Sequence, residues 1–137
     1  MATTTATITL SSSDISDNSL SISNTATLTN QGTDTGMTKT TGLTRVTLAS
    51  GSNVVLIDSG ATTRLNTINK GKFFIQNLND RGDGTKYVTV LMQAVVIGRL
   101  YGGDFAYFPF EGGAGNDIEL TPSDATSTDL EYIAFYE

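Results

Sequence analysis

Residues 72–92 read KFFIQNLNDRGDGTKYVTVLM, two apolar runs separated by a polar turn that contains two glycines. The runs at 72–78 and 86–92 are rich in aromatic and β-branched residues, which favour strands. The turn at 79–85 consists of residue types that reverse the chain direction. The segment therefore predicts the two antiparallel strands of one β-hairpin.

Short apolar runs continue on both sides of this segment, and helical periodicity is almost absent. About eight such runs follow residue 42, at intervals of roughly 8–12 residues, with glycine, asparagine and aspartate between them. This pattern is typical of an antiparallel sandwich, a jelly roll or a small barrel. We predict an all-β fold in which residues 43–137 form an antiparallel β-sandwich or jelly-roll-like domain.

Two runs have apolar residues on both faces, 86–92 and 130–136. Strands of this kind are central in a core or face another protein, so we expect both to be central or to contribute to oligomerisation. The run at 105–110 contains Pro109, which cannot donate to a ladder, and this predicts that the run forms an edge strand or ends there.

Aromatic residues are confined to the later part of the chain, since none occurs before Phe73. The preceding segment holds most of the threonine and serine instead, which extends easily and buries little. We therefore predict that residues 1–42 form an extended Thr/Ser-rich N-terminal arm with short strands. Such an arm needs a neighbour to bury its few apolar side chains.

Within the arm, apolar residues alternate with hydroxyl residues, as expected for strands with one apolar face. We expect a turn at Ser23-Asn24 that separates two short strands. The candidate partner contacts of the arm are its aliphatic residues, Ile8, Leu10, Leu20, Ile22 and Leu28.

The aromatic run at 105–110 is a second candidate for partner contact. Alternation along a strand places Phe105 and Tyr107 opposite Phe108 and Phe110, so about half of these rings are expected in the core. The remaining rings could stack on a sugar or on a partner. The candidate residues for this surface are Tyr101, Tyr107 and Phe110.

The chain has no Cys and no His. These absences exclude a thiolate zinc site and a Ser-His-Asp or Cys-His arrangement, and they remove the commonest general base. We therefore expect a non-enzymatic protein with no catalytic, cofactor or metal site. Five loop carboxylates could bind Ca²⁺, but they lack the spacing of a calcium loop: Asp80, Asp83, Asp104, Glu111 and Asp117.

Two other arrangements have simple structural interpretations. Asp104, Glu119 and Glu131 are acidic candidates for glycoside hydrolysis, but nothing in the sequence brings any two of them together. Arg81-Gly82-Asp83 matches the tripeptide that integrins recognise on loop tips, yet these residue types are common in turns. We interpret the tripeptide as a turn.

The formal net charge is −6, and no Lys or Arg follows Arg99. A nucleic-acid surface needs clustered basic residues, so we expect no nucleic-acid partner. No segment approaches the length of about 20 apolar residues that spans a bilayer, and the N-terminus lacks the pattern of a signal peptide. We therefore expect a protein that is made in a cytoplasm and has no membrane partner.

Two segments resemble small virion proteins of tailed phages. One is Gly98–Pro109, GRLYGGDFAYFP, and the other is the C-terminal segment Asp129–Glu137, DLEYIAFYE. The strand at 72–78 and the Thr/Ser-rich start are similar as well. The resemblance covers residues 43–137 at the level of pattern.

The resemblance implies a β-sandwich structural protein of a phage particle, of the capsid decoration (cement) type. Proteins of this type often form homotrimers that bind the major capsid protein on the outer shell and stabilise the joints between capsomers. The implied location is the capsid surface of a virion made in the host bacterial cytoplasm. The alternative is a tail or head-fibre component, either an adaptor or a host-receptor or glycan-binding module.

Overall fold

The computed structural model of the chain describes residues 3–15, 18–30, 32–57, 71–112, 115–123 and 127–136. Throughout these ranges every regular element is a β-strand. The chain divides into two compact units, Met1–Thr38 and Lys39–Glu137. We call the second unit the body.

The N-terminal unit contains two strands, β1 (Thr5–Ser12) and β2 (Leu20–Thr27). The strands of the body, in chain order, are β3 (Lys39–Thr40), β4 (Thr44–Leu48), β5 (Val54–Ile57), β6 (Gly71–Asn77), β7 (Val88–Met92), β8 (Val95–Leu100), β9 (Phe105–Phe110), β10 (Ile118–Pro122) and β11 (Thr128–Tyr136).

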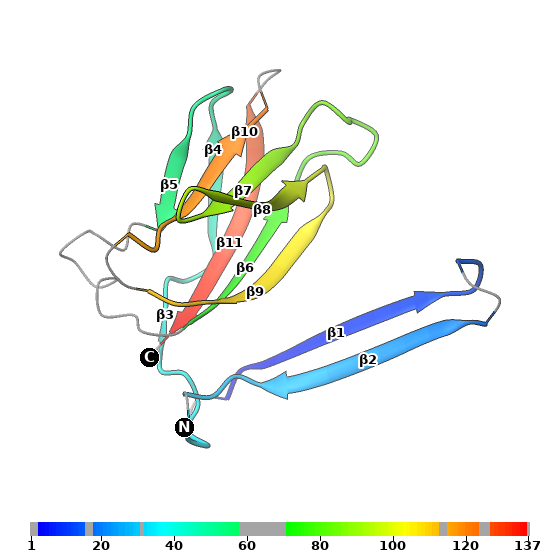
Figure 1. The fold of residues 1–137 in the computed structure, drawn as a ribbon, viewed down its shortest axis with the longest axis vertical. Coiled ribbons are helices and arrows are strands. Elements are labelled where there is room, and N and C mark those ends of the chain that lie inside the picture. Colours follow the sequence, from blue (N-terminus) through cyan, green and yellow to red (C-terminus); the bar gives the residue numbers. More distant parts are fainter. Residues whose placement is uncertain are drawn as a thin grey trace. The chain divides into compact units, whose positions relative to one another are not determined.

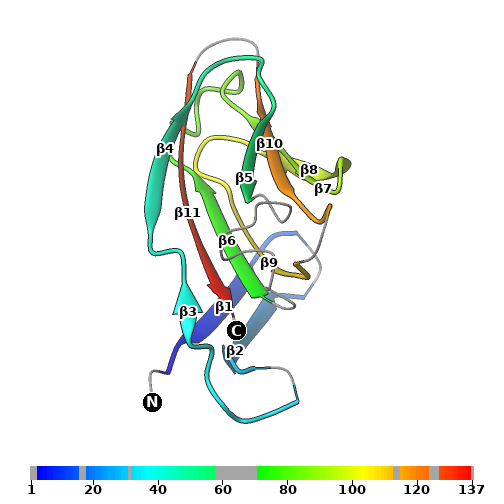
Figure 2. The same cartoon turned by 90° about the vertical axis from the view of Figure 1, so that its left-hand side faces the viewer.

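The body is a sandwich of two antiparallel sheets. One sheet has the strand order β5-β10-β7-β8, and the other has the order β3-β11-β6-β9, with β4 also paired to β11. Figure 2 shows the body from the side, with β4 and β11 in one layer and β10 and β8 in the other. The prediction of an all-β antiparallel sandwich is confirmed.

The core lies between the two sheets and is made by alternate residues of each strand. In β6, for example, Phe73 and Ile75 are fully buried, whereas Phe74 between them is partly exposed. The Phe73 ring packs near three other rings, with centroid distances of 5.4 Å to Phe108, 6.4 Å to Phe110 and 6.0 Å to Tyr132. These rings come from three neighbouring strands of one sheet, β6, β9 and β11, and they pack together on the face toward the core.

The predictions about individual strands are confirmed for three of them. β7 lies between β10 and β8, and β11 lies between β6 and the β3 and β4 strands, so both two-faced strands are central. β9 is an edge strand, as Pro109 predicts. Its face toward the core holds Phe108 and the buried Phe110, while Phe105 is exposed on the other face.

The predicted hairpin at 72–92 is wrong, because its two strands belong to different sheets. β6 pairs with β11 and β9, whereas β7 pairs with β10 and β8. Both strands bury residues in the same core but approach it from opposite sides. The polar segment between them is long enough to cross the gap of about 10 Å between packed sheets, and it therefore connects layers instead of neighbouring strands.

The hairpin of this region is formed instead by β7 and β8, through the two-residue turn Gln93-Ala94. Both residues have positive φ, 52° and 59°, the geometry of a type I′ turn. Asparagine and glycine are the usual residues for this geometry, so Gln93 and Ala94 carry no turn signal in the sequence. The pattern Thr-Pro-Ser-Asp at 121–124 predicts a turn, but β10 continues to Pro122, so its first two residues belong to the strand. Pairing of β10 with β5 ends at Leu120, so proline is tolerated there.

The expected turn at Ser23-Asn24 is absent as well. Ser23 lies opposite Thr9 and Asn24 lies opposite Ile8, within eight consecutive antiparallel pairs of β1 and β2. A serine and an asparagine read as a turn signal in the sequence. In the ribbon, Ser23 simply continues a face composed of hydroxyl side chains, so the strand runs on without a break.

Asn77 at the end of β6 joins the two sheets through hydrogen bonds. Its side chain is fully buried, and its amide donates to the carbonyl oxygens of Lys86 at 2.9 Å and Leu100 at 3.0 Å. Its side-chain oxygen accepts hydrogen bonds from the backbone and side chain of Asn79 at 3.0 and 2.7 Å. One polar side chain thus satisfies backbone groups of the opposite layer where the chain crosses between sheets.

We predict that Asn77→Leu lowers the free energy of unfolding by roughly 2–5 kcal/mol, because it leaves two carbonyl groups without their donor. Gln76→Leu, one residue earlier on the outward face, is the matched control and is expected to change stability by about 0.5 kcal/mol or less. Urea unfolding followed by circular dichroism measures both. Equal effects of the two substitutions would contradict the role assigned to Asn77.

Candidate interaction surface

The N-terminal unit contains a ribbon of two long strands, β1 and β2 (Figure 1). The two faces of this ribbon differ chemically. Directly opposite residues in an antiparallel pair share a face, so the register assigns every side chain. One face, which we call the apolar face, has the two polar residues Ser12 and Asn24 and six alanine or aliphatic residues: Ala6, Ile8, Leu10, Leu20, Ile22 and Ala26. The four larger side chains are exposed to 39%, 52%, 40% and 49% in that order.

The other face, which we call the hydroxyl face, consists of threonine and serine alone. Its pairs are Thr5 with Thr27, Thr7 with Thr25, Thr9 with Ser23, and Ser11 with Ser21. Thr7 and Thr25 are joined by a hydrogen bond of 2.8 Å between their hydroxyl oxygens, and Thr9 and Ser23 by one of 3.4 Å. Cross-strand hydroxyl pairs hold the register and remain compatible with water.

The apolar face is too exposed for a ribbon that has to be stable on its own. An isolated two-stranded hairpin is marginally stable at best in water. Full burial of an aliphatic side chain contributes about 1.5–3 kcal/mol, so covering the exposed half of four of them would contribute roughly 3–6 kcal/mol. That amount is sufficient to turn a marginal ribbon into an ordered one.

The edges of the ribbon are also open to other strands. In the part of the chain that the structure describes, β1 and β2 pair only with each other. Residues 3–13 and 18–30 include no charged residue and no proline, and the register is free of bulges. Charges, prolines and bulges are the features by which proteins prevent strand addition, so both edges can accept a strand.

The remaining predicted contact residues do not join the apolar face or form a second common surface. Leu28 is only 4% exposed and lies just after β2. Phe110 is 5% exposed and belongs to the core, because its position on β9 points between the sheets. It is therefore not available for a sugar or a partner in this structure.

The two tyrosines of that group are differently placed. Tyr101 is 42% exposed, and its ring lies 5.6 Å from that of Tyr87, which also stacks with Arg99 at 4.7 Å. Tyr107 is half-buried on β9, and this burial raises the pKa of its phenol. The three aromatic candidates thus do not make one exposed stacking surface.

Sequence reasoning missed an exposed apolar patch on β8. Val95, Val96 and Ile97 are exposed to 66%, 59% and 52%. Three consecutive aliphatic residues are equally compatible with a buried strand. Only the position of β8 at the edge of its sheet shows that they face solvent.

The polar groups of Arg81-Gly82-Asp83 are engaged within their own turn and its neighbour. Arg81 donates to the carbonyl oxygen of Gly103 at 3.0 Å. The hydroxyl and the amide of Thr85 donate to the Asp83 carboxylate, and these bonds lower the pKa of that carboxyl group. The loop is held as a turn, in agreement with the interpretation from the sequence.

The candidate acidic residues are likewise involved in local bonds. The Asp104 carboxylate accepts a hydrogen bond from the Tyr101 amide, Glu119 accepts one from Asn53, and Glu131 pairs with Arg45 at 2.7 Å. Among the described residues, no three His, Cys, Asp or Glu side chains gather closely enough to hold a metal ion. Over the same ranges, no helix is long and apolar enough to cross a bilayer.

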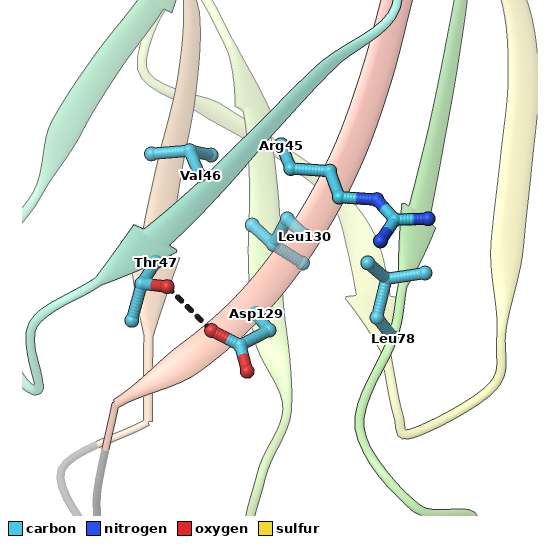
Figure 3. Close-up of a pocket in the computed structure, with 6 residues that line it drawn as sticks. All are labelled: Arg45, Val46, Thr47, Leu78, Asp129 and Leu130. Atoms are coloured by element: carbon cyan, nitrogen blue, oxygen red, sulfur yellow. Dashed lines mark hydrogen bonds between the residues drawn. The ribbon is translucent and has the colours of Figure 1, made fainter.

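A hollow of about 280 Å³ lies on the outer side of β4 and β11 (Figure 3). Its lining residues are Arg45, Val46, Thr47, Leu78, Asp129 and Leu130. Thr47 donates to Asp129 at 2.6 Å, and Arg45 bonds to Glu131, so all three polar side chains of the lining have partners. These are directly opposite cross-strand pairs, and they serve to join β4 to β11.

Neither a protein-family model nor a curated protein sequence matches the chain. The apolar face of the ribbon is therefore the main structural feature that indicates a function.

The body contains its complete core, because every member of the buried cluster lies between Leu48 and Tyr136. We predict that a chain of residues 39–137 folds and unfolds cooperatively, with a midpoint within about 5 °C of the full chain. Differential scanning calorimetry of both proteins provides the measurement. A truncated chain without a cooperative transition would show that the N-terminal unit is needed for the core.

Proposed function

We propose that this protein is a non-enzymatic structural component of a virus particle, a capsid decoration protein whose N-terminal ribbon docks on the outer shell. The single observation that supports a docking role is the apolar face, whose four large side chains are 39–52% exposed on an uncharged ribbon. The assignment to a capsid comes from the resemblance of residues 43–137 to tailed-phage virion proteins.

The ribbon has the properties that a clamp across a joint requires. Its apolar face can cover an apolar patch of the major capsid protein while the hydroxyl face remains in water. Its open edges can add to the edge of a sheet in the shell, where main-chain hydrogen bonds provide affinity and side chains provide specificity. Because ribbon and body belong to one chain, a body bound to one capsomer and a ribbon bound to the next would resist separation of the two.

The strength of such a clamp follows from repetition. A contact worth roughly 3–6 kcal/mol from apolar burial is weak by itself, because association also costs translational and side-chain freedom. On a symmetric shell the same contact occurs many times, and a second contact of the same chain benefits from a high effective concentration. Modest contacts of this kind then hold neighbouring capsomers together.

The proposal predicts that Leu10→Thr together with Ile22→Thr raises the apparent Kd for empty shells of the parent phage about 10- to 100-fold. Each substitution removes roughly 0.7–1.5 kcal/mol of apolar burial, and tenfold in affinity corresponds to about 1.4 kcal/mol. Co-sedimentation with shells at increasing protein concentration measures the change. Circular dichroism checks that the body remains folded.

Thr7→Ser on the hydroxyl face is the matched control and is expected to bind like the unchanged protein. If the double variant saturates shells at the same concentration as the unchanged protein, the apolar face is not the docking surface. If the unchanged protein does not bind shells at all, the capsid assignment fails.

A further inference from the structure

A pair of tyrosine rings lies on the outer face of the β7–β8 hairpin, at the end away from the turn Gln93-Ala94. Val88 and Leu100 are buried and lie directly opposite each other. Tyr87 and Tyr101 are each one residue further along the chain, so alternation directs both side chains away from the core. Their ring centroids are 5.6 Å apart, with an angle of 53° between the ring planes.

Arg99 adds a guanidinium group to this pair of rings. It lies opposite Thr89 on β8, and the central carbon of its guanidinium is 4.7 Å from the centroid of the Tyr87 ring. A cation–π contact of this kind holds the side chain and leaves its N–H groups available to a ligand. Among the described residues, the only ion pair is that of Arg45 with Glu131, so Arg99 has no carboxylate partner there.

The backbone at both tyrosines is fixed by hydrogen bonds. Asn77 donates to the carbonyl oxygens of the two residues that precede the tyrosines. The amide of Ser123 donates to the carbonyl oxygen of Tyr87 at 2.9 Å. The Asp104 carboxylate accepts a hydrogen bond from the Tyr101 amide at 2.9 Å, and the Asp104 amide donates to the Tyr101 carbonyl oxygen at 2.9 Å. The two rings therefore stand on an ordered backbone, and a ligand would lose little affinity to ordering of the site.

The chemistry of this surface fits a sugar ring better than a protein partner. A pyranose has C–H groups on its faces and hydroxyl groups around its rim, so one face can stack on an exposed tyrosine while the rim meets polar groups. Polar groups are present beside the rings, because Thr89 and Thr121 continue the row of Arg99 across the sheet. Two rings and one guanidinium offer far less than the ~800 Å² per partner of a stable protein interface.

The distribution of charge favours an anionic sugar. The segment 79–104 has three basic and three acidic residues, Arg81, Lys86, Arg99, Asp80, Asp83 and Asp104. It is thus formally neutral, whereas the whole chain has a net charge of −6 and no Lys or Arg follows Arg99. An anion therefore meets less repulsion here than at the later strands. A guanidinium can bind a carboxylate through two parallel hydrogen bonds, whereas a nucleic acid would need a cluster of basic residues.

We propose that Tyr87, Arg99 and Tyr101 form a binding site for a sugar that carries a carboxylate, a uronic acid or a sialic acid residue of a glycan. Tyr101 stacks on the sugar ring, Arg99 binds the carboxylate, and Tyr87 holds Arg99 in place. This proposal does not depend on the capsid assignment, because the site belongs to the body alone.

The test is an NMR titration of the full-length, isotope-labelled protein in the absence of shells. The acidic probes are a hyaluronan tetrasaccharide, which contains glucuronic acid, and sialyllactose, and their relative affinities distinguish the two sources of the carboxylate. Chitotetraose is the neutral control. At least one acidic probe is expected to shift the amide signals of Tyr87, Arg99 and Tyr101 with a Kd of about 1 mM, as suits an open surface site. Chitotetraose is expected to bind at least tenfold more weakly.

Substitutions separate the roles of the ring and the charge. Tyr101→Ala is expected to weaken binding of the acidic probe at least tenfold, whereas Tyr101→Phe, which keeps the ring, is expected to leave it within about twofold. Arg99→Gln is expected to abolish the preference for the acidic probe over chitotetraose. Phe105→Ala is the matched control, because Phe105 is an exposed ring on the other sheet, and it is expected to have no effect.

Three results would overturn the proposal. The first is the absence of shifts at these amides with both acidic probes at about 10 mM. The second is equal affinity for the acidic probes and chitotetraose. The third is unchanged binding by Tyr101→Ala. None of these results depends on whether the protein binds shells, so the proposed function and this site can fail separately.

Discussion

A two-stranded ribbon cannot cover either of its own faces, and the proposed docking role of this protein depends on that constraint. The β1–β2 ribbon keeps its hydroxyl face in water without difficulty, because threonine and serine bond to each other and to solvent. The aliphatic side chains of its apolar face cannot form such bonds and are partly exposed. In the role that we propose, the ribbon reaches its stable form when another molecule supplies the missing layer.

The body covers its apolar strand faces within a single chain. Its two sheets cover each other's apolar faces, and the buried Asn77 supplies hydrogen bonds to backbone groups where the chain passes between the layers. One unit is thus complete and the other is not. In the proposed docking role, the body provides the folded platform and the ribbon gains order at the contact.

Much of the fold could be predicted from the sequence, because strand periodicity and turn residues are local signals. The central positions of β7 and β11 followed from their two apolar faces, and the edge position of β9 followed from Pro109. Which strands pair with each other was harder to predict from the sequence. A polar turn such as 79–85 has the same composition whether it joins adjacent strands or crosses between sheets, and the turn at Gln93-Ala94 lacks the usual asparagine and glycine.

Part of the candidate surface was also predictable, because alternation along a strand is a local signal, but which residues share a surface depends on strand pairing. Alternation identified Ile8, Leu10, Leu20 and Ile22, but only the register of β1 with β2 shows that they share one face. Phe110 could not be separated from an exposed aromatic residue, because which face of β9 meets the core depends on β6. Likewise, the exposure of Val96 depends on the absence of a neighbour beyond β8.

Amide hydrogen exchange of the ribbon tests this account most directly. In dilute free protein, the amides of β1 and β2 should exchange within about tenfold of the unstructured rate, while those of β6 and β11 exchange slowly. On decorated particles the ribbon amides should become protected by at least a further tenfold. Ribbon amides that are as protected as those of β6 in the dilute monomer would contradict the claim that a neighbour completes this unit.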